Sequence, residues 1–342
     1  QNADSVNLRD RFIPEAGNPG IQFVLEDIVR VQTTQEFSVD ILGSNLLPEV
    51  KHTALGGSDA YDTDQYLNIW VCKIQPIVIF GIEVGQLLGF AFPPNNLDNW
   101  PADSGAPNAD EDGVVIDFRV FGSNNPNIIV NPSGGGNLAV KGRTPVHEVG
   151  HYFGLRHIWG DGGLLGPNDC AQSDGIDDTP YANAQSNFDC DTTRNTCLQV
   201  EDHYGEDVPD LIENYMDYAS EDCMNMFTKG QADLMRSVLQ GPRSGLLMPF
   251  SSIGRDDLAD GWSIAPNPGD GWFDVSFQAR RGMDVSLFVY NLDGTPLLRK
   301  ENEHVGEGLQ KIRVDGVGFV PGMYLVEIRT PGGREVRKWV KF

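Results

Sequence analysis

The run at residues 147–157 constrains this chain more than any other feature, because it reads His-Glu-x-x-His-x-x-Gly-x-x-His. On an α-helix, residues i and i+4 lie on one face, so His147 and His151 project side by side. Neutral imidazole nitrogens bind Zn²⁺ at about 2.0–2.1 Å. Gly154 tolerates positive φ and can end the helix, which lets the chain turn and bring His157 to the same point. The spacing therefore predicts a three-histidine zinc site.

The residues around the first two histidines indicate catalysis. Glu148 can take a proton from a water at the metal without being a ligand itself. Three protein ligands leave a fourth position open, which is typical of a catalytic rather than a structural zinc. Thr144 and Pro145 suit the start of the helix, as a cap and as a first-turn proline. A helix with unrelated surface histidines would explain neither Glu148 nor the glycine turn.

The charge of the chain is unevenly distributed. The 342 residues carry a net charge of −24. Residues 1–261 hold 14 Lys and Arg against 39 Asp and Glu, whereas residues 262–342 hold 11 against 10, which predicts a domain boundary near residue 261. An acidic domain disfavours binding to nucleic acid and anionic membranes. It fits an extracellular protein that binds Ca²⁺, although solubility alone explains much of the excess.

Two further features concern export and membranes. A membrane-spanning helix needs about 18 consecutive apolar residues, and no apolar run in the chain approaches this length, so we expect no membrane-spanning helix. Residue 1 is Gln and no signal peptide is present, so we expect a processed or partial product.

Four of the five cysteines lie in the loop-rich region after the predicted zinc helix: Cys170, Cys190, Cys197 and Cys223. None forms a Cys-x-x-Cys pair, so a second structural zinc is not expected. An even set in an irregular stretch predicts two disulfides and an oxidising compartment. The residues alone allow three pairings. Cys72 lies in a strand-like run and is predicted to be a buried free thiol.

Residue patterns predict the elements around the motif. Runs rich in β-branched and aromatic residues predict three strands, at 21–34, 67–74 and 113–120. Thr228 and Gln231 form a capping-box pattern that predicts a helix at 229–240. Between the zinc motif and that helix the chain is irregular for about sixty residues, and loops of such length are usually functional or cross-linked.

The C-terminal part of the chain differs from the rest in composition and in residue pattern. Residues 241–261 are rich in Gly, Pro and Ser and indicate a linker. In residues 262–342 apolar and polar residues alternate in short runs separated by Asp-Gly and Pro-Gly turns. This pattern predicts a small antiparallel β-sandwich.

Beyond these motifs, the sequence resembles the metzincin clan of zinc peptidases and, within it, the pappalysin (cytophagalysin, M43) family. Residues 213–218 read Glu-Asn-Tyr-Met-Asp-Tyr and are similar to the Met-turn of the clan. Further supporting runs lie, in order, at 66–72, 89–93, 113–116, 157–161, 178–180 and 223–228. The resemblance covers residues 18–240. It implies an α+β catalytic domain at 1–240, with a twisted sheet, an active-site helix and a loop-rich C-terminal subdomain. In one respect the chain departs from the family pattern. The family's catalytic domain normally begins with a further strand and a long helix before the segment at Ile21, and relatives carry a propeptide, whereas only about twenty residues precede Ile21 here, so we expect a truncated sequence.

The resemblance assigns roles to the residues of the motif and of the Met-turn. It implies that His147, His151 and His157 bind zinc, with Glu148 as general base and acid. Met216 would form the hydrophobic floor of the site, a role that overlaps with ordinary core packing. Tyr218 would donate a hydrogen bond to the tetrahedral oxyanion, a contact worth on the order of 3 kcal/mol when well placed.

The resemblance also assigns cross-links, calcium ligands and specificity. It pairs Cys170 with Cys197 and Cys190 with Cys223. It places Ca²⁺ in the loop at 174–179, with Asp174, Asp177 and Thr179 offering a carboxylate, a carbonyl and a further oxygen; an acidic surface turn is the alternative. Similar proteins often prefer a basic residue after the scissile bond. Asp222 could bind that residue, as could Glu221 or Asp217.

Residues 262–342 resemble the C-terminal sorting domain of type IX secretion. The matching pieces lie at 265–268, 271–273, 290–294, 321–326 and at the basic end 337–342. A generic fibronectin-like binding module shares this architecture and is the alternative. The resemblance implies a secreted or cell-surface protein that is recognised by the type IX secretion machinery.

Together these features predict a secreted zinc endopeptidase that acts on protein or peptide substrates. Glu148 would activate water at the metal, and Tyr218 would stabilise the oxyanion. One alternative is a calcium-stabilised adhesion or binding protein with an inactive peptidase fold, which the intact Glu148 disfavours. A zinc amidase acting on a small substrate is a second alternative, and it would require a closed pocket.

Overall fold

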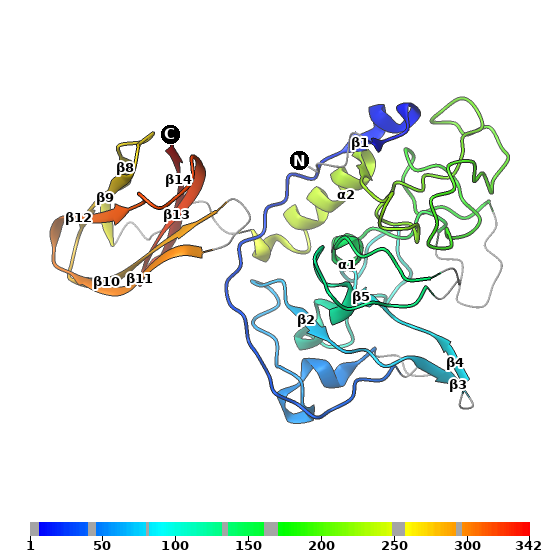
Figure 1. Ribbon diagram of the computed structural model, residues 1–342, viewed down its shortest axis with the longest axis horizontal. Coiled ribbons are helices and arrows are strands. Elements are labelled where there is room, and N and C mark those ends of the chain that lie inside the picture. Colours follow the sequence, from blue (N-terminus) through cyan, green and yellow to red (C-terminus); the bar gives the residue numbers. More distant parts are fainter. Residues whose placement is uncertain are drawn as a thin grey trace. The chain divides into compact units, whose positions relative to one another are not determined.

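The computed structural model describes residues 7–39, 46–79, 82–131, 136–160, 170–247, 257–291 and 296–342. The chain forms two compact units (Figure 1). The first contains residues 1–21 and 29–247, and the second contains residues 22–28 and 248–342. The division after residue 247 falls inside the predicted linker at 241–261, which contains a short 3-10 helix at Ser244–Leu246. The last part of the linker prediction is wrong, because residues 258–261 begin the strand β8 (Leu258–Ala265), and residues 248–256 lie outside the described residues.

The first unit is built around a three-stranded sheet with the strand order β2-β6-β5. β2 (Ile69–Cys72) is parallel to β6 (Val114–Asp117), and β5 (Gly89–Ala91) is antiparallel to β6. All of β6 is buried, as expected for a central strand that is covered on both faces. α1 (Arg143–Tyr152) packs against β5 and β6, which places the histidines of the motif beside an edge strand (Figure 1).

Two small sheets and a second helix complete the first unit. β3 (Ile77–Ile79) pairs with β4 (Ile82–Gly85), and β1 (Ala16–Gly17) pairs with β7 (Phe227–Thr228), both antiparallel. α2 (Lys229–Gln240) follows β7 directly. Short 3-10 helices lie at Asp10–Glu15, Pro48–Lys51, Thr53–Leu55, Ala109–Glu111 and Phe118–Val120.

Two of the three predicted strands are present, and one is not. The runs at 67–74 and 113–120 contain β2 and β6, although the second run ends in a 3-10 turn. The prediction of a strand at 21–34 is wrong, because this segment has no regular secondary structure. Its apolar side chains are largely exposed, Phe23 by 58% and Ile28 by 54%. A β-prone run becomes a strand only where the fold supplies a partner strand and a buried face.

The two helices begin in different ways. α2 has the predicted bounds and the predicted capping box between Thr228 and Gln231. The prediction that Thr144 caps the zinc helix is wrong: α1 begins at Arg143, and its N-cap is Gly142 with a φ of 75°. Glycine adopts this left-handed conformation without steric strain. Thr144 therefore lies inside the first turn and is free to bond elsewhere.

The second unit is an all-β sandwich, as predicted. One sheet has the order β11-β10-β13-β14 and the other has the order β12-β9-β8. The strands are β8 (Leu258–Ala265), β9 (Trp272–Ala279), β10 (Met283–Tyr290), β11 (Pro296–Val305), β12 (Gly308–Asp315), β13 (Gly322–Thr330) and β14 (Gly333–Lys341). Inward-facing side chains of both sheets form one core that includes Phe273, Val289 and Trp339. The predicted α+β class with an all-β C-terminal part is confirmed.

Two disulfides cross-link the loop-rich region between α1 and α2. Cys170 bonds Cys197, and Cys190 bonds Cys223, which is the pairing that the family resemblance implies. Cys72 is a free thiol and is half-buried rather than buried. None of the described helices has the length and apolar character needed to cross a bilayer.

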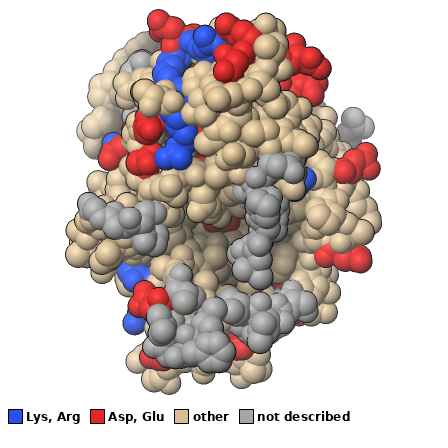
Figure 2. Space-filling view, turned by 90° about the vertical axis from the view of Figure 1, so that its right-hand side faces the viewer, with Lys and Arg blue, Asp and Glu red and all other residues tan. Residues whose placement is uncertain are grey.

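Charged side chains are unevenly placed on the face shown in Figure 2. On the face shown in Figure 2, Asp and Glu lie at several places near the periphery, and Lys and Arg gather in one strip beside some of them. Ion pairs such as Arg9–Glu213 at 2.6 Å and Arg11–Glu206 at 2.7 Å join the N-terminal segment to the loop-rich region. Part of the acidic excess is therefore used to hold loops in place.

Candidate metal centre and active site

The three histidines of the motif converge on one point. His147 and His151 lie on the buried face of α1, and His157 follows the turn at Gly154, whose φ is 88°. The Nε2 atoms of the three rings lie 3.1–3.2 Å from one another. Three points at this spacing can all lie about 2 Å from a common centre, which is the Zn–N distance. The turn that returns His157 is held by Asn99 and Trp100, whose side chains donate to the Gly154 carbonyl at 2.9 and 2.8 Å.

Backbone carbonyls orient two of the rings. His147 Nδ1 lies 2.6 Å from the Tyr215 carbonyl, and His151 Nδ1 lies 2.8 Å from the Leu155 carbonyl. A carbonyl oxygen accepts only, so Nδ1 must carry the proton and Nε2 keeps its lone pair for a metal. Burial lowers the pKa of His147 well below its ordinary value, which also favours the neutral ring. The donor set and its tautomers therefore fit zinc.

Glu148 lies beside the triad on the side of the edge strand. Its side chain is buried, and burial raises its pKa to about 8. A Cβ on Gly89 would come within 2.9 Å of Glu148 Cγ, so only glycine allows β5 this close to the carboxylate. A carboxyl group in such surroundings is suited to exchanging protons with a reacting group.

Met216 lies beneath the zinc helix. It is fully buried, and a Cβ on Gly150 would meet its Sδ atom at 2.4 Å, so the two residues are in close contact. The Met216 amide donates to Asn214 Oδ1 at 2.8 Å, and the turn then places the Tyr215 carbonyl on His147. Met216 therefore lies in the position that the family resemblance implies for a hydrophobic floor, and that role stays a prediction.

The Tyr218 ring packs among the histidines. Its centroid lies 5.4 Å from that of His147, 4.9 Å from that of His157 and 5.0 Å from that of Trp159. Trp159 in turn stacks on His157 with centroids 4.3 Å apart. Tyr218 also lines the pocket beside the triad, so the structure places it next to the site in which it was predicted to act.

A pocket opens beside His147 and Glu148. One wall is the segment 86–89 that leads into β5, and another is the loop at 217–221. The remaining lining residues are Val120, Leu138, Ala139, Thr144, Phe188 and Met224. Two acidic residues of the loop, Asp217 and Glu221, line this pocket together with Glu148.

The three acidic candidates for substrate specificity differ in their surroundings. Asp222 is 56% exposed, pairs with Lys141 Nζ at 2.7 Å, and is not among the residues that line the pocket. Asp217 is buried, and its Oδ1 accepts from the amides of Ser186 and Tyr218 at 3.0 and 2.8 Å. Glu221 accepts bonds from the start of α1.

The predicted calcium residues are only partly brought together. Asp174 is buried, and its Oδ1 accepts from the Thr179 hydroxyl at 2.7 Å and from the Ile176 amide at 3.0 Å. Burial raises the pKa of Asp174 to about 7. Asp177 is exposed. Among the described residues, the histidine triad forms the one cluster of three or more His, Cys, Asp or Glu side chains close enough to share an ion.

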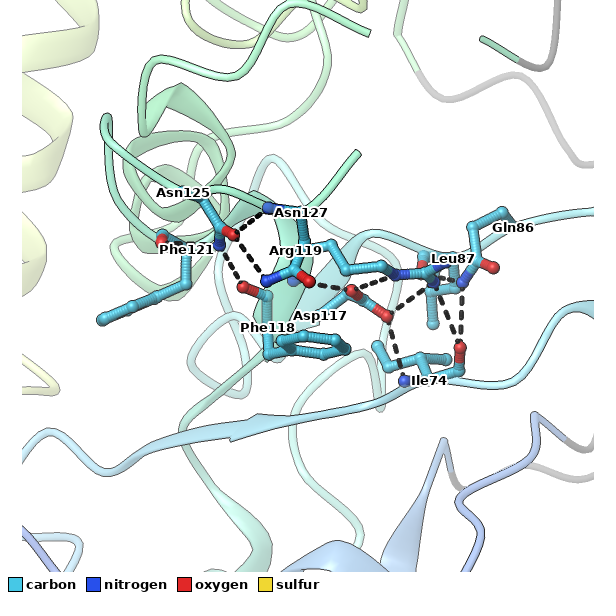
Figure 3. A network of polar contacts seen from close by, with 9 residues as sticks. All are labelled: Ile74, Gln86, Leu87, Asp117, Phe118, Arg119, Phe121, Asn125 and Asn127. Carbon is cyan, nitrogen blue, oxygen red and sulfur yellow. Dashed lines mark hydrogen bonds and ion pairs between the residues drawn. The ribbon is translucent and has the colours of Figure 1, made fainter. Parts of the chain in front are cut away.

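A polar network that no sequence pattern predicted supports the pocket wall (Figure 3). Buried Asp117, at the end of β6, accepts from the Ile74 amide at 3.0 Å and from Arg119 Nε at 2.8 Å. Gln86 Nε2 donates to the carbonyls of Ile74 and Leu87 at 3.2 and 2.8 Å. The network therefore fixes the segment 86–87 of the wall. No sequence pattern marks it, because its members lie up to 45 residues apart.

Comparisons with known proteins agree with this geometry. The M43 peptidase model, described as pregnancy-associated plasma protein-A, matches residues 137–240, and a secretion system C-terminal sorting domain matches residues 263–341. Mature mirolysin of Tannerella forsythia, solved with a cleaved peptide, is 32% identical with a TM-score of 0.53; the match covers 72% of this chain and 82% of that one.

Curated relatives match more locally. Extracellular metalloproteases of Arthroderma benhamiae and Coccidioides posadasii are each 34% identical, over 39% and 49% of this chain. The chain spans 40% and 50% of the length of these two relatives. The C-terminal sorting domain marks the protein as secreted. The chain therefore belongs to the M43 (pappalysin) family of zinc metallopeptidases.

Proposed function

We propose that this protein is a secreted zinc endopeptidase that hydrolyses peptide bonds in protein substrates. The observation that carries the proposal is the convergence of the Nε2 atoms of three histidines at 3.1–3.2 Å beside a buried glutamate. A pocket lies next to these groups and leaves room for a substrate. A structural zinc site would have four protein ligands and no such pocket.

Each group in the site has a distinct part in peptide hydrolysis. A zinc ion held by the three histidines would lower the pKa of a coordinated water to about 7 and polarise a peptide carbonyl. Glu148 takes the proton of the attacking water and delivers it to the leaving amine. Tyr218, beside His147 and His157, donates a hydrogen bond to the carbonyl oxygen as it gains negative charge.

The acidic residues around the pocket favour a substrate with a basic side chain after the scissile bond. Asp222 is the residue proposed to bind that side chain, which would exchange with Lys141 as its partner. Cleavage of two peptides that differ only in Arg or Leu at this position tests the assignment. Asp222→Asn should lower kcat/KM for the Arg peptide alone, and an equal loss on both peptides would contradict it.

Calcium is a second proposed ion. Asp174, Asp177 and Thr179 lie in one loop, and Asp174 Oδ2 is buried with no hydrogen bond to any described residue. A cation there would compensate a buried carboxylate oxygen. Added Ca²⁺ should raise the Tm of wild type and have a smaller effect on Asp174→Asn.

The C-terminal sandwich is proposed to bind the type IX secretion machinery. The match to a secretion system sorting domain at 263–341 supports this assignment over a generic fibronectin-like module. Replacing the sandwich by an unrelated fibronectin-like domain should leave the protein inside the cell. If the sandwich were only a generic binding module, the replacement would not change export.

The main proposal is tested with Glu148→Gln, which keeps the shape of the side chain and removes its basicity. The variant should bind zinc as wild type does, measured as metal per chain, and should not cleave casein. 1,10-Phenanthroline should abolish cleavage by wild type. A folded, zinc-loaded wild-type protein that leaves denatured protein substrates intact would favour the binding-protein alternative, and activity on small amides alone would favour the amidase.

A further inference from the structure

We propose that Glu221 is a positioning residue that couples the start of the zinc helix to the loop carrying Tyr218. The inference rests on the proposed peptidase function. It concerns how two walls of the pocket are held together, and it gives Glu221 a role other than binding the basic side chain of a substrate.

Glu221 satisfies the start of α1 from a distant part of the chain. Its Oε1 accepts from the Thr144 amide at 2.9 Å and from the Thr144 hydroxyl at 2.7 Å. Its Oε2 accepts from the amides of Lys141 and Arg143, the latter at 3.1 Å. Both oxygens of one carboxylate are therefore engaged by a segment 77 to 80 residues away.

The local sequence explains why a remote cap is needed. The N-cap of α1 is Gly142, which has no side chain with which to accept from the first-turn amides. Pro145 has no amide hydrogen, so Arg143 and Thr144 are the first-turn donors that require an acceptor. Glu221 is 8% exposed, and a carboxylate at this end of a helix is stabilised by the helix dipole.

The coupled elements carry the reacting groups. α1 presents His147 and Glu148 to the pocket, and the loop at 217–221 presents Tyr218. The disulfide between Cys190 and Cys223 fixes the loop from its other side, two residues beyond Glu221. Glu221 therefore sets the distance between the oxyanion donor and the general base, a distance to which rates of this kind of reaction are sensitive.

The competing role for Glu221 is recognition of a basic substrate side chain, since it lines the pocket. A side chain in that role needs a free oxygen, and here both oxygens already accept two bonds each. Binding an arginine would require breaking these bonds and leaving the amides of α1 without an acceptor.

The test compares Glu221→Gln with Asp222→Asn, which changes the adjacent exposed carboxylate, and with Thr144→Val. Gln keeps one acceptor oxygen and replaces the other by a donor, so at least one of the amide hydrogen bonds is lost. We expect kcat to fall about tenfold on both the Arg and the Leu peptide, with KM changed less than about twofold. Amide exchange of Arg143 and Thr144 should be at least about tenfold faster in Glu221→Gln and unchanged in Asp222→Asn, which touches only the side chain of Lys141. Adding Thr144→Val to Glu221→Gln should lower kcat by a smaller factor than Thr144→Val lowers it in the wild-type protein, because the hydrogen bond between the two side chains is already weakened.

Two results would overturn the inference. One is a loss confined to the Arg peptide with normal amide exchange, which would make Glu221 a specificity residue. The other is a variant with wild-type kcat and wild-type exchange. Amide exchange is measured without substrate, so it reports on the coupling between Glu221 and the zinc helix whether or not the enzyme is active. A wild-type protein that cleaves neither peptide would refute the proposed peptidase function, and the exchange result would still test the inference about Glu221.

Discussion

Lys51 is a fully buried lysine, and its replacement by methionine tests how the wall behind the edge strand is built. Its Nζ donates to the Glu111 carbonyl at 2.8 Å and lies 4.5 Å from the ring centroid of Phe92 and 4.9 Å from that of Phe90. Phe90 belongs to β5, whose Gly89 touches Glu148. The ammonium group thus lies in an aromatic environment directly behind the active-site strand.

The pKa of Lys51 gives the magnitude of the effect. Burial lowers it from 10.5 to about 8, against the opposing influence of Glu111 and Asp112. At 1.36 kcal/mol per pKa unit, charging Lys51 in the folded protein costs about 3 kcal/mol relative to the unfolded chain. Below pH 8 both states are charged and the full cost applies. As pH rises from 8 to 10.5 the folded side chain is neutral while the unfolded one still binds a proton, so the cost disappears.

Urea unfolding of wild type and Lys51→Met at pH 7 and pH 10 measures this difference. Between these two values the wild type should gain about 2.5 kcal/mol of stability relative to the variant. Effects of pH on zinc binding and on all other groups occur in both proteins and cancel. A stability difference that is the same at both pH values would refute the reasoning, because it would mean that Lys51 titrates normally in the folded state.

Three further changes test other parts of the fold and site. Tyr218→Phe should lower kcat by about 10²–10³ with little change in KM, measured with a quenched peptide, because only the transition state gains the hydrogen bond. Gly150→Ala should cost about 1–3 kcal/mol in thermal unfolding, since its Cβ would overlap Met216 Sδ. Arg243→Met should cost about 3–5 kcal/mol in urea unfolding, because it leaves Asp112 without its partner at 2.6 Å and the Tyr152 carbonyl without its donor at 2.7 Å. A loss below about 1 kcal/mol would contradict that estimate.

The features that sequence predicted well are those encoded by short spacings. The triad and Glu148 follow from helix periodicity and one glycine, and α2 follows from a capping box and one apolar face. In each case every interacting partner lies within a few turns of the same segment. The strand at β6 was predicted from its β-branched and aromatic residues, and the prediction is confirmed because this run is a central strand buried on both faces.

The features that were missed depend on partners far away in the sequence. The run at 21–34 has the composition of a strand but no regular structure. Thr144 looked like a helix cap, whereas the cap is completed by Glu221 from the loop after the Met-turn. Lys51 and Arg243 carry no sequence signal of burial, and both are buried because a carbonyl or a carboxylate 60 to 131 residues away accepts from them.

Gln231 shows how such distant contacts reach the metal ligands. Its side chain completes the capping box of α2 and also exchanges two hydrogen bonds with Asn214, at 2.8 and 3.1 Å. Asn214 in turn accepts from the Met216 amide, and the same turn presents the Tyr215 carbonyl that fixes the tautomer of His147. Since the acceptor is a backbone carbonyl, its position depends on the turn and not on the identity of residue 215. The histidine motif therefore specifies which atoms can bind zinc, and the bonds from α2 to the Met-turn decide whether His147 points its lone pair at the ion.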